Sequence, residues 1–268
     1  MNPKIKFSYV TLFPDLIRHY LSDALLSKAE KKGLLDFSVL DLRQFSTNSY
    51  KSVDDKPFGG GDGVVIEAEP VYQALQSLNP PAAECKVIYL SPQGRRLDQH
   101  LVAELSQEKH LVFICGRYGG IDHRLIQSAV DLEISVGDYI LSGGELAALI
   151  VTESVSRLVP GVLGDFNSTK QDSFSDDMAG LLEAPQFTRP MNWKDQVVPA
   201  VLSSGHHQAV ESWKKNMSYL ITLKKRPDLL VGQKIDWKQV QEFYNKISQT
   251  EREALGIQDL AAEIEQRK

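Results

Sequence analysis

The sequence of 268 residues has few of the features that mark exported or membrane proteins. It contains two cysteines, Cys85 and Cys115, and both adjoin apolar runs. We therefore expect reduced, buried thiols and no disulfide. No run reaches the roughly 20 apolar residues of a membrane helix, and the first residues lack the apolar segment of a signal peptide. These absences predict a cytoplasmic protein without a membrane anchor.

A basic excess is also missing, since the formal net charge is −5. Proteins that bind nucleic acid usually carry a positive surface, so the whole-chain charge does not by itself indicate such a partner. Residues 191–240 are an exception, with eight Lys or Arg against four acidic residues and a local charge of +4. This segment is either a solvated helical face or a basic patch.

The common nucleotide-binding fingerprints are absent. No strand is followed by G-x-G-x-x-G with an acidic residue at the usual distance, and no glycine-rich loop carries the lysine of a P-loop. The sequence therefore argues against an ordinary dinucleotide fold and against a nucleoside triphosphate as ligand.

Alternating strand-like and helix-like segments are present over residues 1–160. Short runs rich in Val, Ile and Phe predict strands at Lys4–Leu12, Asp36–Leu42, Lys86–Ser91, His110–Gly116 and Asp131–Gly137. Between them, helical patterns cover Pro14–Lys32, Pro70–Leu78, Asp98–Gln107, Asp122–Ala129 and Gly144–Leu158, with Pro14 and Asp98 as helix-start residues. This alternation predicts an α/β domain with a mostly parallel sheet.

The composition and the periodicity of the sequence change after Pro160. Residues 161–190 have little periodicity and many Gly, Ser, Asp and Pro residues, which is typical of a linker or loop. Two amphipathic helical patterns follow, one through Trp213 and Met217 and one through Val240 and Tyr244. We therefore predict three parts: a domain at 1–160, a flexible linker at 161–190 and a small α-helical domain at 191–268.

Glycine-rich turns follow three of the predicted strands, at Ser91–Arg95, Gly116–Asp122 and Gly137–Glu145. The carboxyl ends of parallel strands share one edge of a sheet, where α/β proteins bind ligands. Glycine lets the backbone approach a ligand closely. The three turns together predict a small-molecule pocket, whereas the cluster Gly59–Gly63, taken alone, is better read as a flexible turn.

Several motifs in unbroken order from about Ile5 to Leu230 carry a family resemblance. They are Phe58-Gly59-Gly60-Gly61, Tyr89-Leu90-Ser91-Pro92-Gln93-Gly94, Gly116-Arg117-Tyr118, Gly137-Asp138-Tyr139-Ile140-Leu141-Ser142-Gly143-Gly144-Glu145, Ser154-Val155-Ser156-Arg157, Pro160-Gly161-Val162-Leu163-Gly164 and Asp172-Ser173-Phe174. In these motifs the chain resembles the bacterial tRNA (guanine-N1)-methyltransferase family of the SPOUT class.

The resemblance implies a fold and a cofactor. The later strands of the sheet would thread into a deep trefoil knot, an exception to the rule that connections do not thread loops. S-adenosylmethionine would lie in this knot. By position, its contacts would be Tyr89, Leu90, Ser91, Pro92, Gly116, Tyr118, Gly120, Ser135, Val136, Gly137, Asp138, Tyr139, Ile140, Leu141, Gly143 and Gly144.

The resemblance also implies methyl transfer to N1 of guanosine-37 of tRNA, next to the anticodon, which supports maintenance of the reading frame. N1 is protonated and a poor nucleophile, so a base must remove its proton while a cationic donor stabilises charge on O6. By position these are Asp172 and Arg157. Without the resemblance, Asp172 would read as a solvated turn carboxylate and Arg157 as a charge at a helix end.

The implied partners are tRNA with a guanine 3′ of the anticodon and a second copy of the chain. The active site would form across a homodimer, with the linker and helical domain of one subunit over the knot of the other. Expected tRNA contacts are Gly59, Gly60, Gly61, Ser173, His207, Lys214 and Lys215. Because adjacent helical residues point in different directions, His206 and His207 do not predict a metal site.

The chain departs from the family pattern at four places. Gly119 stands where the family has a glutamate, so the resemblance does not establish a Mg²⁺ requirement and we predict no metal ligands. Asp62 and Ala147 each replace a common proline, and Ser175–Met178 lengthen the segment after Asp172. None of these changes replaces Asp172 or Arg157, so the expected activity stands.

Two alternatives remain at the level of the sequence. One is another SPOUT reaction, such as ribose 2′-O-methylation of RNA, which would not need the Asp172 segment. The other is a non-catalytic RNA-binding protein that keeps the knot. The absence of the family's glutamate, which Gly119 replaces, is the reason to consider it.

Overall fold

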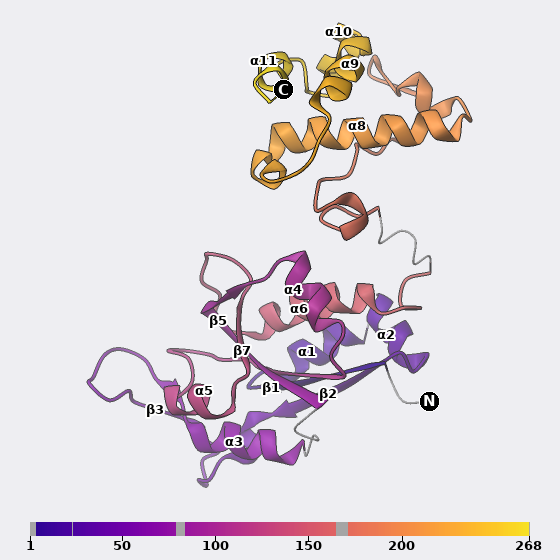
Figure 1. The fold of residues 1–268 in the computed structure, drawn as a ribbon. Helices are drawn as coiled ribbons and strands as arrows, with labels where there is room; N and C mark the ends of the chain where they lie inside the picture. Colours follow the sequence, from indigo (N-terminus) through magenta and orange to yellow (C-terminus); the bar gives the residue numbers. More distant parts are fainter. Residues whose placement is uncertain (1–3, 23, 79–83, 165–170, 268) are drawn as a thin grey trace. The chain divides into compact units, whose positions relative to one another are not determined.

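The computed structural model describes residues 4–22, 24–78, 84–164 and 171–267. Contacts divide the chain into two units, residues 1–166 and 167–268. Figure 1 follows the chain from the strands of the first unit to the helices of the second. In the described parts of the chain, no helix is long and apolar enough to span a membrane.

The first unit is built on a five-stranded sheet in which every pair of neighbours is parallel. In spatial order the strands are β2 (Leu35–Asp41), β1 (Ile5–Thr11), β6 (His110–Ile114), β5 (Cys85–Arg96) and β7 (Leu132–Ser135). The prediction of an α/β fold with a mostly parallel sheet is confirmed.

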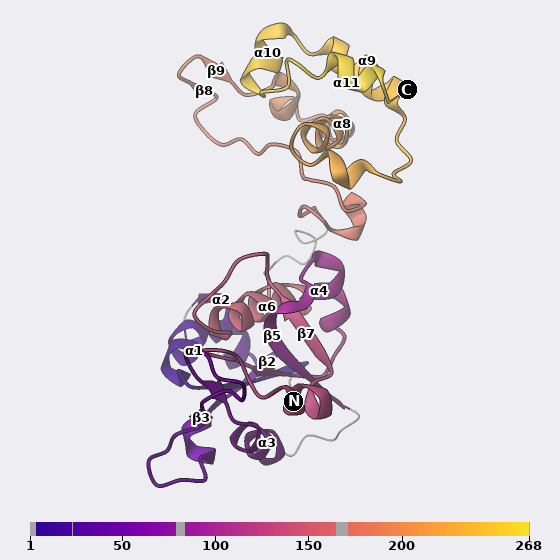
Figure 2. The ribbon, with the colours of Figure 1, turned by 90° about the vertical axis from the view of Figure 1, so that its left-hand side faces the viewer.

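Helices cover both faces of this sheet. On one face are α1 (Pro14–Leu21), α2 (Ala24–Lys31), α4 (Gln99–Leu105) and α6 (Glu145–Leu158). On the other face are α3 (Ala68–Ser77) and α5 (His123–Ala129). Figures 1 and 2 show α3 on the side of the sheet opposite α6. A strand covered on both faces is apolar on both faces, which explains the continuous apolar runs in the sequence.

The core divides between the two faces according to the alternation of side chains along each strand. Phe7 stacks against Phe113 with ring centroids 6.3 Å apart, on the side of α1 and α6. Val10 and Val112 lie on the side of α3. All four side chains are at most 1% exposed, so the centre of the sheet is buried from solvent on both faces.

Both predicted helix-start residues are confirmed. Pro14 is the first residue of α1, where its missing N–H costs no hydrogen bond. Asp98 precedes α4, and its Oδ1 accepts a hydrogen bond from the backbone N–H of Leu101 at 2.8 Å.

Three local predictions were wrong. The helix expected over Pro14–Lys32 is two helices, because the backbone at Ala24 has a φ of 50°, which a continuous helix does not allow. The strand expected to end at Ser91 continues to Arg96, with a register shift against β7 between Leu90 and Arg95. Cys85 is half-buried, although Cys115 is buried; both are free thiols.

The glycine cluster lies between two short strands that the sequence did not reveal. Strands β3 (Asp54–Asp55) and β4 (Val65–Ile66) pair in antiparallel fashion and enclose it. The backbone N–H of Ile66 donates to the carbonyl of Gly120 at 3.0 Å, and that of Gly119 donates to the carbonyl of Val64 at 2.9 Å. The base of this loop is thus attached to the turn after β6.

The second unit is mainly helical. Its elements are η3 (Asp176–Met178), β8 (Asn192–Trp193), β9 (Gln196–Val197), η4 (Ala200–Ser203), α8 (His207–Lys225), η5 (Pro227–Leu230), α9 (Trp237–Lys246), α10 (Gln249–Ala254) and α11 (Ala261–Glu265). Trp213 and Met217 of α8 pack with Val240 and Tyr244 of α9, as the helical periodicity predicts.

The segment expected as a linker contributes to this second core. Leu181 and Ala184 are 3% and 7% exposed and pack in the same cluster as Met217. The backbone N–H of Leu182 donates to Oγ1 of Thr222 at 3.1 Å. Residues 165–170 of the expected linker lie outside the described residues.

Candidate functional site

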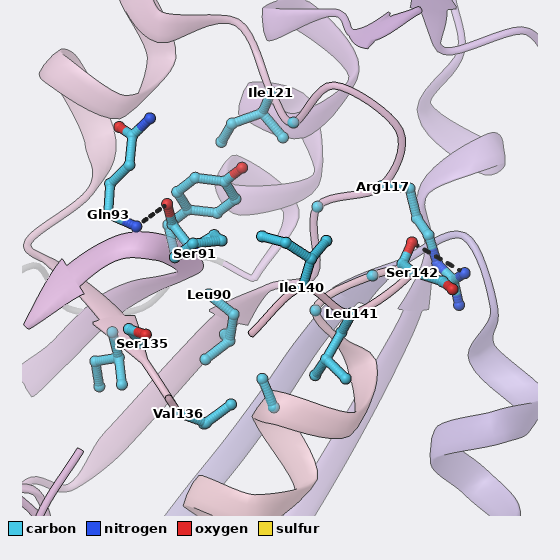
Figure 3. A pocket seen from close by; sticks show the side chains of 18 of the residues that line it. Leu90, Ser91, Gln93, Arg117, Ile121, Ser135, Val136, Ile140, Leu141 and Ser142 are labelled. Atoms are coloured by element: carbon cyan, nitrogen blue, oxygen red, sulfur yellow. Dashed lines mark hydrogen bonds between the residues drawn. The ribbon is translucent and has the colours of Figure 1, made fainter. Parts of the chain in front are cut away.

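A cavity of about 380 Å³ lies beside the second half of β5 and the carboxyl ends of β6 and β7. Three separate segments line it, at 89–93, 116–121 and 134–144, with further contributions from α5 and α6. Figure 3 shows the apolar side chains of Leu90, Ile140 and Leu141 turned toward the same space. The turns after β6 and β7 therefore meet beside β5, as the parallel arrangement of the strands predicts, whereas the segment Ser91–Arg95, expected as a turn, lies within β5.

Of the residues expected to contact the cofactor, all except Asp138 line this cavity. The cavity also includes residues that the sequence analysis did not assign. These are Gln93, Arg117, Gly119, Ile121, His123, Ile126, Ile134, Ser142 and Ala147. Gln93, Arg117 and Ser142 lie inside motifs quoted for the resemblance, and Ala147 was noted only as a departure from the family. Ile126 comes from a helix position that gave no signal.

Two glycines hold the turns together at the floor of the cavity. The backbone N–H of Gly144 donates to the carbonyl of Gly116 at 2.9 Å. A Cβ on Gly144 would lie 2.9 Å from Cα of Cys115, and a Cβ on Gly116 would lie 2.9 Å from the Tyr89 ring. Glycine is therefore required at Gly144 by close approach of backbone to backbone, and at Gly116 by close approach of the Tyr89 ring.

A buried carboxylate fixes the same two turns from the side of α6. Glu145, with a side chain 1% exposed, accepts hydrogen bonds from Oγ1 of Thr11 at 2.8 Å and from Nε of Arg117 at 3.0 Å. Nη1 of Arg117 also donates to the carbonyl of Ser142 at 3.3 Å. A buried carboxylate is stable only when its oxygens are paired, so Thr11, Arg117 and Glu145 act as one unit.

The Arg117 side chain has a second support outside the hydrogen bonds. Its guanidinium carbon lies 4.2 Å above the centroid of the Phe13 ring. Such a cation–π contact restricts the guanidinium plane, which keeps its donors aligned with Glu145 and Ser142.

Burial also sets the protonation state near the cavity. It raises the pKa of the Tyr89 hydroxyl, so Tyr89 remains neutral and can donate a hydrogen bond at neutral pH. Burial raises the pKa of the Cys115 thiol well above its usual value. Cys115 is thus an unreactive, protonated side chain beneath the cavity.

The two residues expected to carry the chemistry belong to different units. Arg157 is half-buried in the last turn of α6, and Asp172 is half-buried in a turn of the second unit. Neither lines the cavity.

The insertion after Asp172 is folded: the backbone N–H of Ser175 donates to the carbonyl of Asp172 at 3.2 Å, and Ser175 caps η3.

The expected tRNA contacts are also divided between the units. Gly59, Gly60 and Gly61 form an exposed loop of the first unit. The side chain of Ser173 accepts a hydrogen bond from the backbone N–H of Glu183 at 3.0 Å. His207 is exposed at the first turn of α8, Lys215 is exposed farther along that helix, and Lys214 is half-buried.

The position of the missing family glutamate lies in the cavity wall. A Cβ on Gly119 would lie 3.1 Å from the carbonyl oxygen of Val64, so a larger residue there requires a small shift of the backbone just before β4. Among the described residues, no group of three or more His, Cys, Asp or Glu side chains is arranged to hold a metal ion.

Comparisons with known proteins show which family the chain belongs to. A family model described as tRNA (Guanine-1)-methyltransferase TrmD matches residues 5–232. The chain is 47% identical to a protein of Carboxydothermus hydrogenoformans over 226 residues, which is 84% of this chain and 87% of the relative. It is 42% identical to a protein of Halalkalibacterium halodurans over 244 residues, which is 91% of this chain and 98% of the relative.

A relative from Shewanella baltica is 48% identical over 222 residues, which is 82% of this chain and 88% of the relative. All three relatives are named tRNA (guanine-N(1)-)-methyltransferase. The matched region includes every segment that lines the cavity, together with Arg157 and Asp172. With a match of this length, the chain belongs to the tRNA (guanine-1)-methyltransferase family.

Proposed function

We propose that this protein transfers a methyl group from S-adenosylmethionine to N1 of the guanosine immediately 3′ of the anticodon in tRNA. The observation that carries the proposal is the family match over residues 5–232, which includes a cavity built from the motifs of that family. Modification of this base supports correct reading of the frame during translation, which takes place in the cytoplasm.

The cavity suits the proposed cofactor. Its volume of about 380 Å³ lies within the ~300–1,000 Å³ of small-molecule sites. The partly buried glycines Gly137 and Gly143 line the cavity without side chains, which favours recognition of a polar ligand by main-chain groups, and Leu90 and Ile140 offer apolar walls. When bound, S-adenosylmethionine supplies an electrophilic methyl group on a sulfonium. The residues of this chain position the cofactor and exclude water from it.

In this proposal, Asp172 removes the N1 proton of guanine as the methyl group is transferred, and Arg157 donates hydrogen bonds to O6. Both roles come from the resemblance to the family. The half-buried position of each side chain supports them, because a partly desolvated charge interacts more strongly with a substrate than an exposed one does.

The proposal includes a trefoil knot in the first unit. Two features support it. Residues Arg117 and Gly143 form an isolated antiparallel bridge, and the backbone of Gly144 bonds to that of Gly116. These contacts hold the turn after β7 against the turn after β6, within the part of the sheet where the resemblance implies the knot.

Homodimer formation is also part of the proposal. Exposed apolar side chains lie on α1 and α6 with helical spacing: Leu16 and Tyr20 on α1, and Leu146 and Ile150 on α6. The two helices adjoin, since the Tyr20 hydroxyl donates to Glu153 Oε2 at 3.4 Å. Exposed apolar side chains on two adjoining helices fit a second copy of the chain, whose own linker and second unit would complete the active site.

We further propose that residues 1–160 bind the cofactor, that 161–190 connect the domains, and that 191–268 bind tRNA. The positive local charge of residues 191–240 supports the last assignment, because phosphate contacts dominate RNA affinity.

The decisive experiment measures transfer of a labelled methyl group to an unmodified tRNA transcript with guanosine 3′ of the anticodon. A matched transcript with adenosine at that position is the control. We expect label only in the first transcript, on N1 of guanine after digestion to nucleosides. Label on a ribose would support a 2′-O-methyltransferase instead. Cofactor binding without transfer would support a non-catalytic RNA-binding protein.

A further inference from the structure

The second unit contains a cavity of its own, of about 480 Å³. It lies between the segment 185–198, which includes β8 and β9, and the side of η4 and α8. Its lining residues are Pro185, Gln186, Phe187, Thr188, Arg189, Met191, Val198, Leu202, Ser203, Val210 and Lys214. Of these, only Lys214 was assigned from the sequence, because the others come mainly from irregular backbone without periodicity.

An aromatic ring forms one wall of this second cavity. Phe187 is 42% exposed, and its ring centroid lies 6.4 Å from that of the buried Trp213. Contact with the core on one side holds the ring in place, while the exposed part remains available to a ligand. A fixed aromatic ring with an exposed face is the usual stacking platform for a nucleobase.

The polar groups of this cavity favour a ligand with both hydrogen-bonding edges and negative charge. Gln186, Thr188 and Ser203 supply neutral donors and acceptors. The charged side chains among the lining residues, Arg189 and Lys214, are both cationic. The side-chain amide of Gln186 also donates a hydrogen bond to Glu183 Oε2 at 3.3 Å, so this nearby carboxylate already has a hydrogen-bond partner.

We propose that this cavity binds one unpaired nucleotide of the substrate tRNA, with its base against Phe187 and its phosphate at Lys214 and Arg189. The inference rests on the proposed function, because it takes tRNA as the partner. A base in a helical stem has stacked faces and paired edges, so only a looped-out or single-stranded nucleotide presents the flat apolar face and free edges that this cavity matches.

The size of the cavity supports a single nucleotide. A volume of about 480 Å³ is that of a small-molecule site and is too small for a helical stem. The cavity would therefore hold the tRNA at one nucleotide, separately from the cavity of the first unit, which would bind the cofactor. Binding there would contribute to the KM for tRNA, since it makes no contact with the reacting atoms.

The experiment measures the Kd of the full-length protein for an unmodified tRNA transcript, and the kcat for methyl transfer at saturating tRNA. Phe187→Ala removes the stacking wall, and we expect the Kd to rise about tenfold or more with kcat nearly unchanged. Ser203→Trp obstructs the cavity from an exposed position of η4 and should raise the Kd to a similar extent without opening the core.

Val231→Ala is the matched control for packing, because Val231 is 80% exposed in the same unit and does not line the cavity. Lys214→Ala should raise the Kd and reduce the slope of log Kd against log salt by about one. Lys234→Ala removes the same charge outside the cavity, so its effect on the Kd should be smaller.

Wild-type Kd values in both Phe187→Ala and Ser203→Trp would overturn the inference. So would a loss of the dimer in Ser203→Trp, measured by sedimentation, since the cavity would then belong to a contact between subunits. If the wild-type protein transfers no methyl group but the two variants still bind tRNA more weakly, the proposed function fails while the nucleotide site stands. If transfer is normal and the variants bind normally, the nucleotide site alone fails.

Discussion

The two units differ in how their sites are built. The cavity of the first unit is formed by backbone turns at the ends of parallel strands and is fixed by the Gly116–Gly144 contact and the buried Glu145. The cavity of the second unit is formed by side chains on an irregular segment and α8, with cations at its edge. A backbone-built site tolerates little change and suits one small cofactor, whereas a site of exposed side chains suits a large, charged partner.

The largest expected effect concerns Asp172 of the second unit, the residue that we propose as the base. Asp172→Ala should lower kcat for methyl transfer by about 10²–10⁴, because the guanine proton loses its base. Calorimetry should show a cofactor Kd within about twofold of wild type, since Asp172 does not line the first cavity. Asp176→Ala, an exposed neighbour in η3, is the control. Near-normal turnover of Asp172→Ala would remove this residue from the mechanism.

The next effect tests whether the first site depends on its backbone. Gly144→Ala should reduce kcat/KM about 100-fold, because the new Cβ meets the Cys115 backbone and displaces a turn of the cavity by a fraction of an ångström. Cofactor titrations should show the loss, while the Kd for tRNA should change little. Gly164→Ala is the matched control, since a Cβ on Gly164 would have no atom within 4 Å. Normal cofactor kinetics in Gly144→Ala would contradict a backbone-built site.

A smaller effect separates stability from chemistry. Glu145→Gln should lower the free energy of unfolding by roughly 2–3 kcal/mol, because the Arg117 guanidinium loses its charged partner in a dry environment. Urea denaturation followed separately by probes in each unit should show the shift only in the first. Glu153→Gln, on the more exposed side of α6, is the control. A shift of similar size in both variants would mean that helix charge, and not the buried pair, accounts for the loss.

The smallest effect concerns the exposed cations of the second unit. Lys215→Ala should raise the KM for tRNA a few-fold and reduce the salt dependence by about one ion, with kcat unchanged. Steady-state kinetics at several salt concentrations provide the measurement, and Lys246→Ala in α9 is the control. An equal effect of the two variants would indicate that the overall positive charge of the second unit attracts tRNA, and that Lys215 makes no local contact.

Much of the first unit could be predicted from the sequence because its strands are buried on both faces. Val112 and Phe113 lie on opposite faces of β6, yet both are 0% exposed, so the run reads as continuously apolar. The break at Ala24 could not be predicted, because the apolar periodicity continues across it and only the backbone φ of 50° reveals two helices. The extension of β5 through Pro92 and Gly94 was missed for the converse reason, since both residues usually end a strand.

The candidate site shows the same division. The glycine turns at Gly116–Asp122 and Gly137–Glu145 were visible because each follows a strand, and strand ends of one parallel sheet meet at one edge. The second core was visible only in part: Trp213 and Met217 have helical spacing, but Leu181 and Ala184 pack with them from a segment without periodicity. Contacts between irregular backbone and a helix leave no repeating pattern in the sequence.

The sequence alone determined the class of fold, the five strands of the main sheet and the family, because these depend on periodicity and on motifs that are local in the chain. Only the tertiary structure decided that Arg117 joins Thr11 and Glu145, that Gly144 contacts Gly116, and that residues 185–198 enclose a cavity with α8. These are contacts between residues far apart in the chain, and burial, close packing and hydrogen bonding select them only once the elements have come together.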